Sequence, residues 1–442
     1  MAQTYGNPIE IQIQITNLIL WANWVKSGYF WYTCRPKRIV DGRSGEDRPC
    51  FQGLDSYSGA QNVVMDNIIL SSGLAFIICF FSIPVIIQVA KDKKLYDEPD
   101  ERKVHKNVIP TLGGLGIFAG FAMALLLGFP PSGTIELPYF MASFLVVFFL
   151  GLKDDILILS ATKKFAGQII AAFILVYFAD IRIDNMHGFL GIQEIPTLAS
   201  TILTVLTIVV IINSYNLIDG VDGLAGSLAT LTSIAFGIYF AIIHQIGYAV
   251  MAFALAASLI SFLIYNFSPA KIFMGDTGSL LVGLIQSILV IQFIKLCDSA
   301  AVPFRINGGP AIGFAALSIP LFDTLRVFGQ RIFNRRSPFS PDRNHIHHYL
   351  LDAGCSHPRI TLTLIGINLL TLGVAILLRD FGTNYLIATI LFIGTTYTTF
   401  IYRYRQRVLL RNKARKAMQG SEAELLSSNR LFHLQPETAD VD

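Results

Sequence analysis

The sequence predicts an all-α protein that crosses a membrane about eleven times. Its 442 residues are 53% hydrophobic and only 14% charged, with a mean hydropathy of +0.55, so the chain is far more apolar than a soluble domain. From Asp66 onward, apolar runs long enough to span a bilayer alternate with short polar connections. Lys and Arg gather in every second connection, which is typical of a polytopic membrane protein with basic cytoplasmic loops.

The apolar runs predict eleven helices in chain order, at residues 67–90, 112–129, 137–152, 165–181, 197–215, 225–244, 249–267, 279–295, 310–330, 360–378 and 384–402. Lys and Arg number six between the first two runs, three after the third, one after the seventh, six around the ninth loop and seven just after the eleventh. The other connections hold only Arg182, Lys295, Arg305 and Arg379. The positive-inside rule therefore predicts a core that begins outside and ends in the cytoplasm.

Residues 1–64 differ from the rest of the chain and are interpreted as an N-terminal extension. They hold all three tryptophans, six Lys or Arg and a polar stretch from Asp41 to Gln61. The apolar part near Ile11–Trp24 is a poor span, and it lacks the basic start and cleavage site of a signal peptide. Its six basic residues would lie on the wrong side of the first span, so we expect the functional protein to start at or near Met65. The expected divisions are then the extension 1–64, a transmembrane core domain 65–404 and a basic, then polar, cytoplasmic tail 405–442.

The charge and cysteine content exclude several kinds of partner. A net charge of +4 spread over the whole chain does not indicate nucleic-acid binding. The five cysteines are odd in number, scattered and without a CxxC pair. They argue against a disulfide framework or a thiolate metal site.

One eleven-residue stretch, Asn213–Gly223, places two carboxamides and two carboxylates directly after an apolar run. Four polar positions spaced three apart cannot share one helical face, so the helix is expected to end inside the stretch, with glycine allowing the turn. Between Lys164 and Lys271 the only Lys or Arg is Arg182. A bound cation, or basic residues from elsewhere in the chain, must therefore balance these oxygens.

The predicted topology brings further polar motifs to the same cytoplasmic face. They are Tyr96–Lys106, Pro110–Gly114, Gly151–Asp155, Asn266–Ser279 and Pro320–His348. Five carboxylates from three loops, facing Arg, Lys and His, predict a divalent cation and a polyanionic ligand; they are Asp154, Asp155, Asp219, Asp222 and Asp276. Oxygen ligands favour Mg²⁺ or Mn²⁺, and a zinc site at the three histidines ranks below phosphate binding. At Gly275–Ser279, the start of a helix favours an anion.

These motifs resemble those of the polyprenyl-phosphate N-acetylhexosamine-1-phosphate transferases. The resemblance runs from about Met65 to the end of the eleventh span. It rests on Asp154-Asp155, Asn213–Gly223, Phe273–Ser279 and Ser337–His348. In the last motif Ile346 separates His345 from the other two histidines. This spacing is similar to the bacterial branch that transfers GlcNAc-1-phosphate to undecaprenyl phosphate, rather than to the MurNAc-pentapeptide branch with three consecutive histidines.

The resemblance implies an enzyme of the bacterial inner membrane that transfers GlcNAc-1-phosphate from UDP-GlcNAc to undecaprenyl phosphate and releases UMP. This would be the lipid-linked first step of cell-surface polysaccharide synthesis. It implies Asp276 and Asn216 as metal ligands, Asp154 beside the acceptor phosphate, and Asp155 as its support. The further implied residues are Asp219, Asp222, His347 and His348 in catalysis, and Lys106, Lys163, Asn213, Arg343 and His345 in substrate binding. Direct attack is favoured over a covalent aspartyl intermediate.

Two other classes remain as alternatives. A secondary transporter usually carries mid-membrane charge and repeat symmetry, neither of which is evident. A glycosyltransferase acting at the sugar carbon would release UDP instead of UMP. The sequence also leaves open another UDP-HexNAc donor, UDP-MurNAc-pentapeptide, and the oligomeric state, a homodimer included.

Overall fold

The computed structural model of this protein describes residues 53–93, 109–130, 136–335 and 344–432. The chain divides into two units, Met1–Ser56 and Tyr57–Asp442, and the second unit carries the features discussed below. Its described residues form helices joined by short connections, with one isolated β-bridge between Asn185 and Glu194. Residues 1–52, which make up most of the expected extension, lie outside the described residues.

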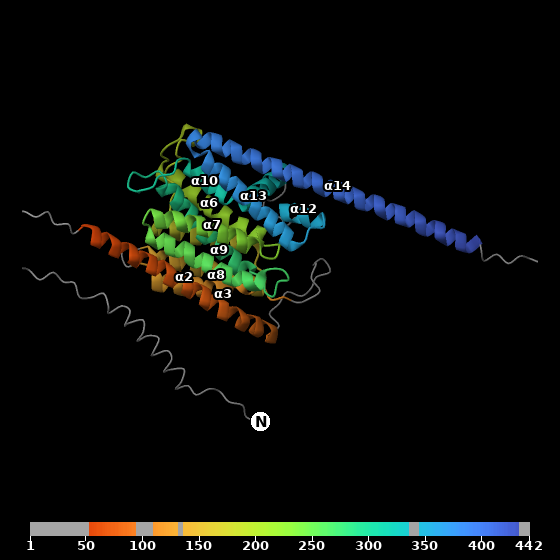
Figure 1. Ribbon diagram of the computed structural model, residues 1–442, viewed down its shortest axis with the longest axis horizontal. Coiled ribbons are helices and arrows are strands. Elements are labelled where there is room, and N and C mark those ends of the chain that lie inside the picture. The colour runs from red at the N-terminus through yellow and green to blue at the C-terminus, as the bar shows by residue number, and fades with distance from the viewer. Residues whose placement is uncertain (1–52, 94–108, 131–135, 336–343, 433–442) are drawn as a thin grey trace, which may run out of the picture. The chain divides into compact units, whose positions relative to one another are not determined.

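A helix lies on each of the eleven apolar segments that the sequence predicts (Figure 1). The helices are α2 (Gly53–Asp92), α3 (Gly113–Gly128), α4 (Leu137–Leu157), α5 (Ala161–Phe178), η2 (Phe189–Gly191), α6 (Thr197–Ile218), α7 (Leu224–Ile242), α8 (Ile246–Asn266), α9 (Gly275–Leu296), α10 (Gly309–Ala316), α11 (Ser318–Phe333), α12 (Ile346–Asp352), α13 (His357–Leu377), η3 (Arg379–Phe381) and α14 (Thr383–Phe432).

The helices confirm an all-α polytopic membrane protein, although the count of eleven spans is not confirmed. Within the described residues, eight helices are long and apolar enough to cross a membrane. Helix α3 is apolar but has only 16 residues. The predicted span 310–330 is a pair of helices, α10 and α11, bent by 88°.

Proline explains the bend between α10 and α11. The ring of Pro320 clashes with the carbonyl of the residue four positions earlier, Ala316, so a straight helix cannot continue. Asn368 of α13 takes over the freed groups: its Nδ2 donates to the Ala316 carbonyl (3.0 Å), and its Oδ1 accepts from Ser318 Oγ (3.0 Å) and from the Ile319 amide (3.3 Å). A break in an apolar environment is tolerated because another helix satisfies the backbone in this way.

Helix α9 is the centre of the bundle. Its residues from Thr277 to Phe293 are all buried, as expected for a helix that is apolar on every side. Helices α3, α4, α6, α7 and α10 pack against α9, which lies near the middle of the bundle in Figure 1. The first turn of α9 is therefore surrounded by the ends of other helices.

Glycines bring the backbones around the start of α9 into direct contact. A Cβ atom on Gly114 would lie 2.2 Å from the Gly278 nitrogen, and one on Gly151 would lie 2.5 Å from the Thr277 Cα. The Gly113 and Gly114 amides donate to the carbonyls of Phe273 and Met274, each at 2.9 Å. Helices α3 and α4 therefore approach α9 more closely than any side chain would allow.

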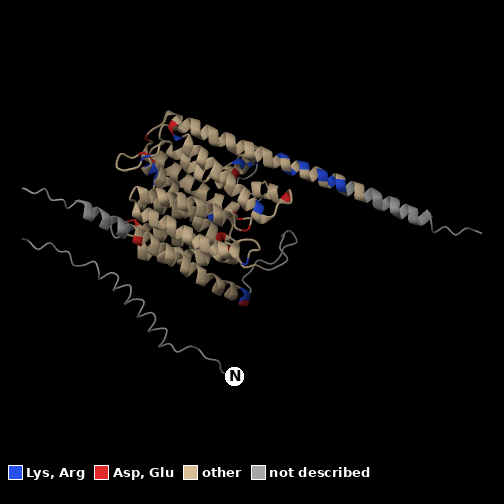
Figure 2. Ribbon diagram, viewed as in Figure 1, with Lys and Arg blue, Asp and Glu red and all other residues tan. Residues whose placement is uncertain are grey.

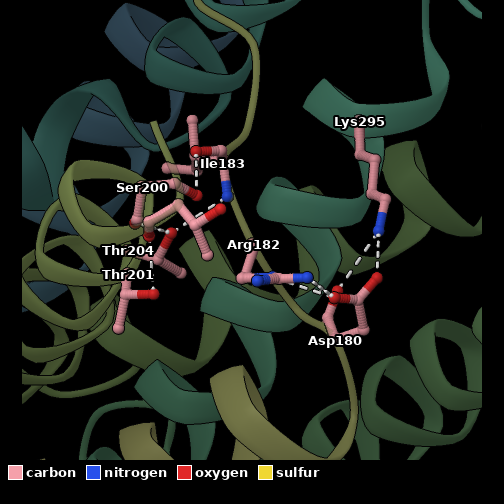
Figure 3. Close-up of polar contacts among 8 residues, drawn as sticks. Asp180, Arg182, Ile183, Ser200, Thr201, Thr204 and Lys295 are labelled. Atoms are coloured by element: carbon pink, nitrogen blue, oxygen red, sulfur yellow. Dashed lines mark hydrogen bonds and ion pairs between the residues drawn. The ribbon is translucent and has the colours of Figure 1, made fainter. Parts of the chain in front are cut away.

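The opposite end of the bundle is tied together by a separate polar network (Figure 3). The Asp180 carboxylate pairs with Arg182 and with Lys295, whose Nζ lies 2.9 Å from Oδ2. Burial raises the pKa of Asp180, but the two neighbouring cations outweigh it and hold that pKa below its usual range. The Ile183 amide donates to Thr204 Oγ1 (2.9 Å). This network joins the segment after α5 to the start of α6 and to the end of α9.

Charged residues lie mainly at the ends of the bundle and along α14 (Figure 2). Arg182 and Lys295 belong to the basic-poor connections, and the structure places them at the same end of the bundle. The acidic motifs meet at the other end, as the contacts below show. In the fold, as predicted, a basic-poor set of connections and the set that carries the acidic motifs thus lie at opposite ends of the bundle.

Candidate active site at the start of α9

The Asn213–Gly223 stretch ends α6 as the sequence predicts. Helix α6 stops at Ile218, Asp219 follows it, and α7 begins at Leu224. Gly223 has φ = +76°, a left-handed conformation that favours glycine. Its amide donates to Asn266 Oδ1 (2.9 Å), so the turn is also fixed to the end of α8.

Asp155 caps the first turn of α9. Its Oδ1 accepts from the Asp276 amide (2.7 Å), and its Oδ2 accepts from the Thr277 amide (2.9 Å) and the Thr277 hydroxyl (2.5 Å). These are helix N-terminal amides, which have no partner within the helix and favour an anion. The anion predicted at this helix start is therefore the Asp155 side chain, which joins α4 to α9.

Lys164 links two carboxylates of the site and was not singled out from the sequence. Its Nζ pairs with Asp154 Oδ2 and lies 2.5 Å from Asp276 Oδ2. The linker between α4 and α5 is short, because α4 ends at Leu157 and α5 begins at Ala161, so the chain returns beside its own acidic end. That short linker is the signal that could have identified Lys164. The predicted Lys163 is its exposed neighbour.

The two asparagines of α6 have different partners. Asn216 Nδ2 donates to Asp276 Oδ1 (2.5 Å) and to Ser279 Oγ (3.0 Å), so Asn216 and Asp276 lie together as the resemblance implies. Asn213 Nδ2 donates to Gln168 Oε1 (2.8 Å) on α5 and to the Val209 carbonyl (2.7 Å). The Asn213 amide is thus engaged in packing α6 against α5.

Asp219 faces other carboxylates without a basic partner among the described residues. Burial raises the pKa of Asp219 well above its usual value, and the nearby charges of Asp276, Asp155 and Asp222 raise it further. A cation beside this carboxylate would reverse the shift. Asp219 is the clearest sign in the structure that the site is built for a positively charged ligand.

Asp222, which the sequence places with the catalytic carboxylates, holds the loop to its neighbours. Its Oδ1 lies 3.1 Å from His357 Nδ1 at the start of α13, and its Oδ2 accepts from the Ala270 amide (3.4 Å). Its carbonyl accepts from Thr361 Oγ1 (3.1 Å). The sequence analysis did not single out His357, because nothing links α13 to the acidic motifs before the fold is known.

The histidine motif reaches the site from α12. His345 Nδ1 lies 2.9 Å from Asp323 Oδ2, and a Cβ on Gly220 would lie 2.7 Å from His347 Nε2. His347 therefore packs directly on the loop that carries Asp219. The His347 and His348 ring centroids are 4.3 Å apart. Lys106 and Arg343, two further predicted ligands, lie outside the described residues.

Burial keeps the His347 side chain neutral. It lowers the pKa of His347 to about 3, and the neighbouring His348 lowers it further. Its Nδ1 is buried and has no hydrogen-bond partner among the residues that the structure describes. A buried polar atom without a partner costs free energy, so a ligand that bonds to this ring would recover it.

The donor set fits a hard divalent cation in type. Within the residues that the structure describes, no three His, Cys, Asp or Glu side chains are arranged as a metal site. Asp276, Asn216 and Asp219 nevertheless supply oxygen atoms. In the described part of the chain, Lys164 is the one Lys or Arg paired with any of the four carboxylates Asp154, Asp155, Asp219 and Asp276. Oxygen ligands with excess negative charge suit Mg²⁺ or Mn²⁺ rather than zinc.

Comparison with known proteins gives the family. Residues 137–294 match the family described as glycosyl transferase family 4. A probable undecaprenyl-phosphate N-acetylglucosaminyl 1-phosphate transferase of Bacillus subtilis is 33% identical over 75% of this chain and 91% of its own length. The chain belongs to the polyprenyl-phosphate N-acetylglucosamine-1-phosphate transferase family.

Other members of this family are similar over comparable lengths. The undecaprenyl-phosphate alpha-N-acetylglucosaminyl 1-phosphate transferase of Haemophilus influenzae is 31% identical over 76% of this chain and 93% of its own length. The decaprenyl-phosphate N-acetylglucosaminephosphotransferase of Mycobacterium tuberculosis is 33% identical over 70% of this chain and 81% of its own length. The segment that matches this family spans α4 to α9 and so includes Asp154, Asp155, Asp219, Asp222 and Asp276.

Proposed function

We propose that this protein transfers GlcNAc-1-phosphate from UDP-GlcNAc to undecaprenyl phosphate. The products would be UMP and undecaprenyl-diphosphate-GlcNAc. Membership of the transferase family supports the reaction class, and the names of the similar proteins support the donor and acceptor. The observation that carries the proposal is the cluster of Asp154, Lys164, Asp276 and Asn216 at the start of α9, with His347 of α12 packed against the adjoining loop.

In the proposed reaction one P–O bond forms and another breaks. A phosphate oxygen of the lipid acceptor attacks the β-phosphorus of UDP-GlcNAc, and the bond between that phosphorus and the bridging oxygen breaks. UMP leaves with the bonding electrons, and the sugar–oxygen bond stays intact, so the anomeric configuration is retained. The main barrier is repulsion between two anionic substrates, which positive charge and hydrogen-bond donors at the site would lower.

Each residue has a role that follows from its contacts. Lys164 supplies the positive charge at the site and keeps Asp154 and Asp276 in place. Asp155 fixes the first turn of α9, so it acts by positioning Asp276. A phosphate monoester is largely ionised near neutral pH, so Asp154 is assigned to positioning the acceptor rather than to an obligatory proton transfer. His347, held neutral by burial, would donate a hydrogen bond from its ring N–H to an oxygen of the diphosphate.

We further propose that the enzyme uses Mg²⁺, with Mn²⁺ as a substitute. Asp276 and Asn216 would hold the ion. Asp219 lies close enough to Asp276 for the charge of Asp276 to raise the pKa of Asp219. When bound, the cation would offset the charge of the diphosphate. The distribution of Lys and Arg supports a protein of the bacterial inner membrane whose site faces the cytoplasm. UDP-sugars are available on that side.

The test uses purified protein in detergent with UDP-GlcNAc, undecaprenyl phosphate and Mg²⁺. The proposal expects UMP and lipid-diphosphate-GlcNAc in equal amounts, and loss of both in excess chelator. Release of UDP would instead mean transfer at the sugar carbon. Product formation with UDP-MurNAc-pentapeptide or a 6-deoxy HexNAc donor in preference to UDP-GlcNAc would contradict the assigned sugar.

A further inference from the structure

The histidine-bearing helix α12 is too short to be stable alone. It has seven residues, and isolated helices of that length do not persist in water. Asp323 of α11 holds its beginning: its Oδ2 lies 2.9 Å from His345 Nδ1, and its Oδ1 accepts from the Ile346 amide (3.1 Å). Something else must fix the far end of α12.

Arg405 of the C-terminal helix α14 contacts that far end. Its Nη2 lies 2.6 Å from Asp352 Oδ2, at the last residue of α12. Its guanidinium carbon lies 4.8 Å from the centroid of the buried Tyr349 ring, a cation–π distance. The Tyr402 ring meets Tyr349 edge-on at 5.8 Å. Figure 1 shows α14 running past α12.

Tyr349 connects Arg405 to the residues that hold the histidines. A second guanidinium, that of Arg326, lies 5.4 Å from the same ring centroid. Arg326 Nη2 also donates to Asp323 Oδ1 (2.8 Å), and Asp323 binds His345. The His345 and His347 rings are stacked, with centroids 5.7 Å apart and planes 11° apart. Described contacts therefore run without a gap from α14 to the ring that packs on Gly220.

We propose that Arg405 is a positioning residue, which sets the orientation of α12 and thereby places His347 against the Asp219–Gly220 loop. The proposal rests on the function proposed above for this site. Arg405 differs from its neighbours on α14, because Arg403 and Arg407 are exposed while Arg405 is partly buried against α12. A basic residue that served only to anchor the helix at the membrane surface would not need this placement.

The first test measures steady-state kinetics of Arg405→Ala by UMP release. We expect kcat to fall about tenfold, or about 1.4 kcal/mol, with the KM for UDP-GlcNAc nearly unchanged. That is the size expected from one cation–π contact and one partly exposed ion pair. Arg403→Ala and Arg407→Ala are the matched controls and should keep the wild-type kcat. Equal rates in all three variants would overturn the proposal.

Two further variants separate positioning from folding. Arg405→Lys keeps the charge near Asp352 but loses the flat guanidinium over Tyr349, so its kcat should lie between those of the wild type and Arg405→Ala. The exchanged pair Arg405→Asp with Asp352→Arg should recover part of the loss of Arg405→Asp alone. A double exchange no better than the single variant would contradict the role of this ion pair.

The second test does not depend on activity. Amide hydrogen exchange in residues 345–353 should become faster in Arg405→Ala, while exchange in α9 should stay at the wild-type rate. Unchanged exchange in 345–353 would overturn the proposal even if kcat fell. If the wild type releases no UMP, the proposed function fails, and this measurement still decides whether Arg405 holds α12.

Discussion

Replacing Gly220 with alanine tests the placement of His347 with a single methyl group. The added Cβ would lie 2.7 Å from His347 Nε2, whereas ordinary Cβ contacts begin at 3.4 Å. The ring must therefore retreat by about 3.4 − 2.7 = 0.7 Å. The backbone at Gly220 does not adopt a left-handed conformation, so alanine adds no strain of its own there.

A displacement of this size should lower kcat strongly and change the thermal stability little. Misplacing a catalytic group by about 1 Å can cost on the order of 100-fold in rate, so we expect Gly220→Ala to lower kcat by about 10- to 100-fold. The assay is UMP release from UDP-GlcNAc at saturating acceptor. Thermal unfolding in detergent should change little, because the loop lies at the edge of the bundle.

Gly366→Ala in α13 is the matched control. A Cβ there meets nothing within 4 Å, and alanine favours a helix, so this variant should keep full activity and gain slightly in stability. If Gly220→Ala released UMP within twofold of the wild-type rate, His347 would not need its place against the loop. The reasoning that joins the histidine helix to the carboxylates would then be refuted.

Three other substitutions probe the carboxylate cluster. Asp276→Ala should leave less than a tenth of the wild-type turnover in Mg²⁺ with normal expression, because the side chain serves chemistry more than folding; retention of more would remove Asp276 as a ligand. Lys164→Gln should lower kcat by roughly 10²- to 10³-fold, since it leaves Asp154 and Asp276 without their cation; a change in KM alone would contradict this role. Asp219→Asn should raise the melting temperature in chelator at pH 8. Its raised pKa in the folded state means that stability falls as pH rises above the ordinary value, so the gain should shrink toward pH 4.

Hydropathy predicted the helices well, because span length and apolar composition are local properties of the chain. Each predicted segment carries a helix, and α6 ends inside the Asn213–Gly223 stretch, where glycine chemistry required it. The break between α10 and α11 was missed. An apolar window does not show whether a distant residue, here Asn368, can satisfy the backbone groups that Pro320 sets free.

The candidate site was predicted in outline, because the alternation of connections decides which motifs share an end of the bundle. Asp155, Asn216 and Asp276 lie together as expected. The sequence could not show that Asp222 pairs with His357, since that contact depends on how α13 packs. Lys164 could have been recognised from the short linker after α4, and it is the partner that the sequence analysis left unnamed.

The start of α9 is joined to α3 by main-chain hydrogen bonds, whereas the contacts described at the two ends of α12 are made by side chains. Contacts between backbones leave no torsional slack, but a side-chain tether can lengthen or swing as χ angles change. The active site thus combines a rigid part, the start of α9, with a helix, α12, that can shift. A bulky lipid diphosphate would leave by displacing α12. The rate of product release, rather than the rate of bond breaking, would therefore depend most on solvent viscosity.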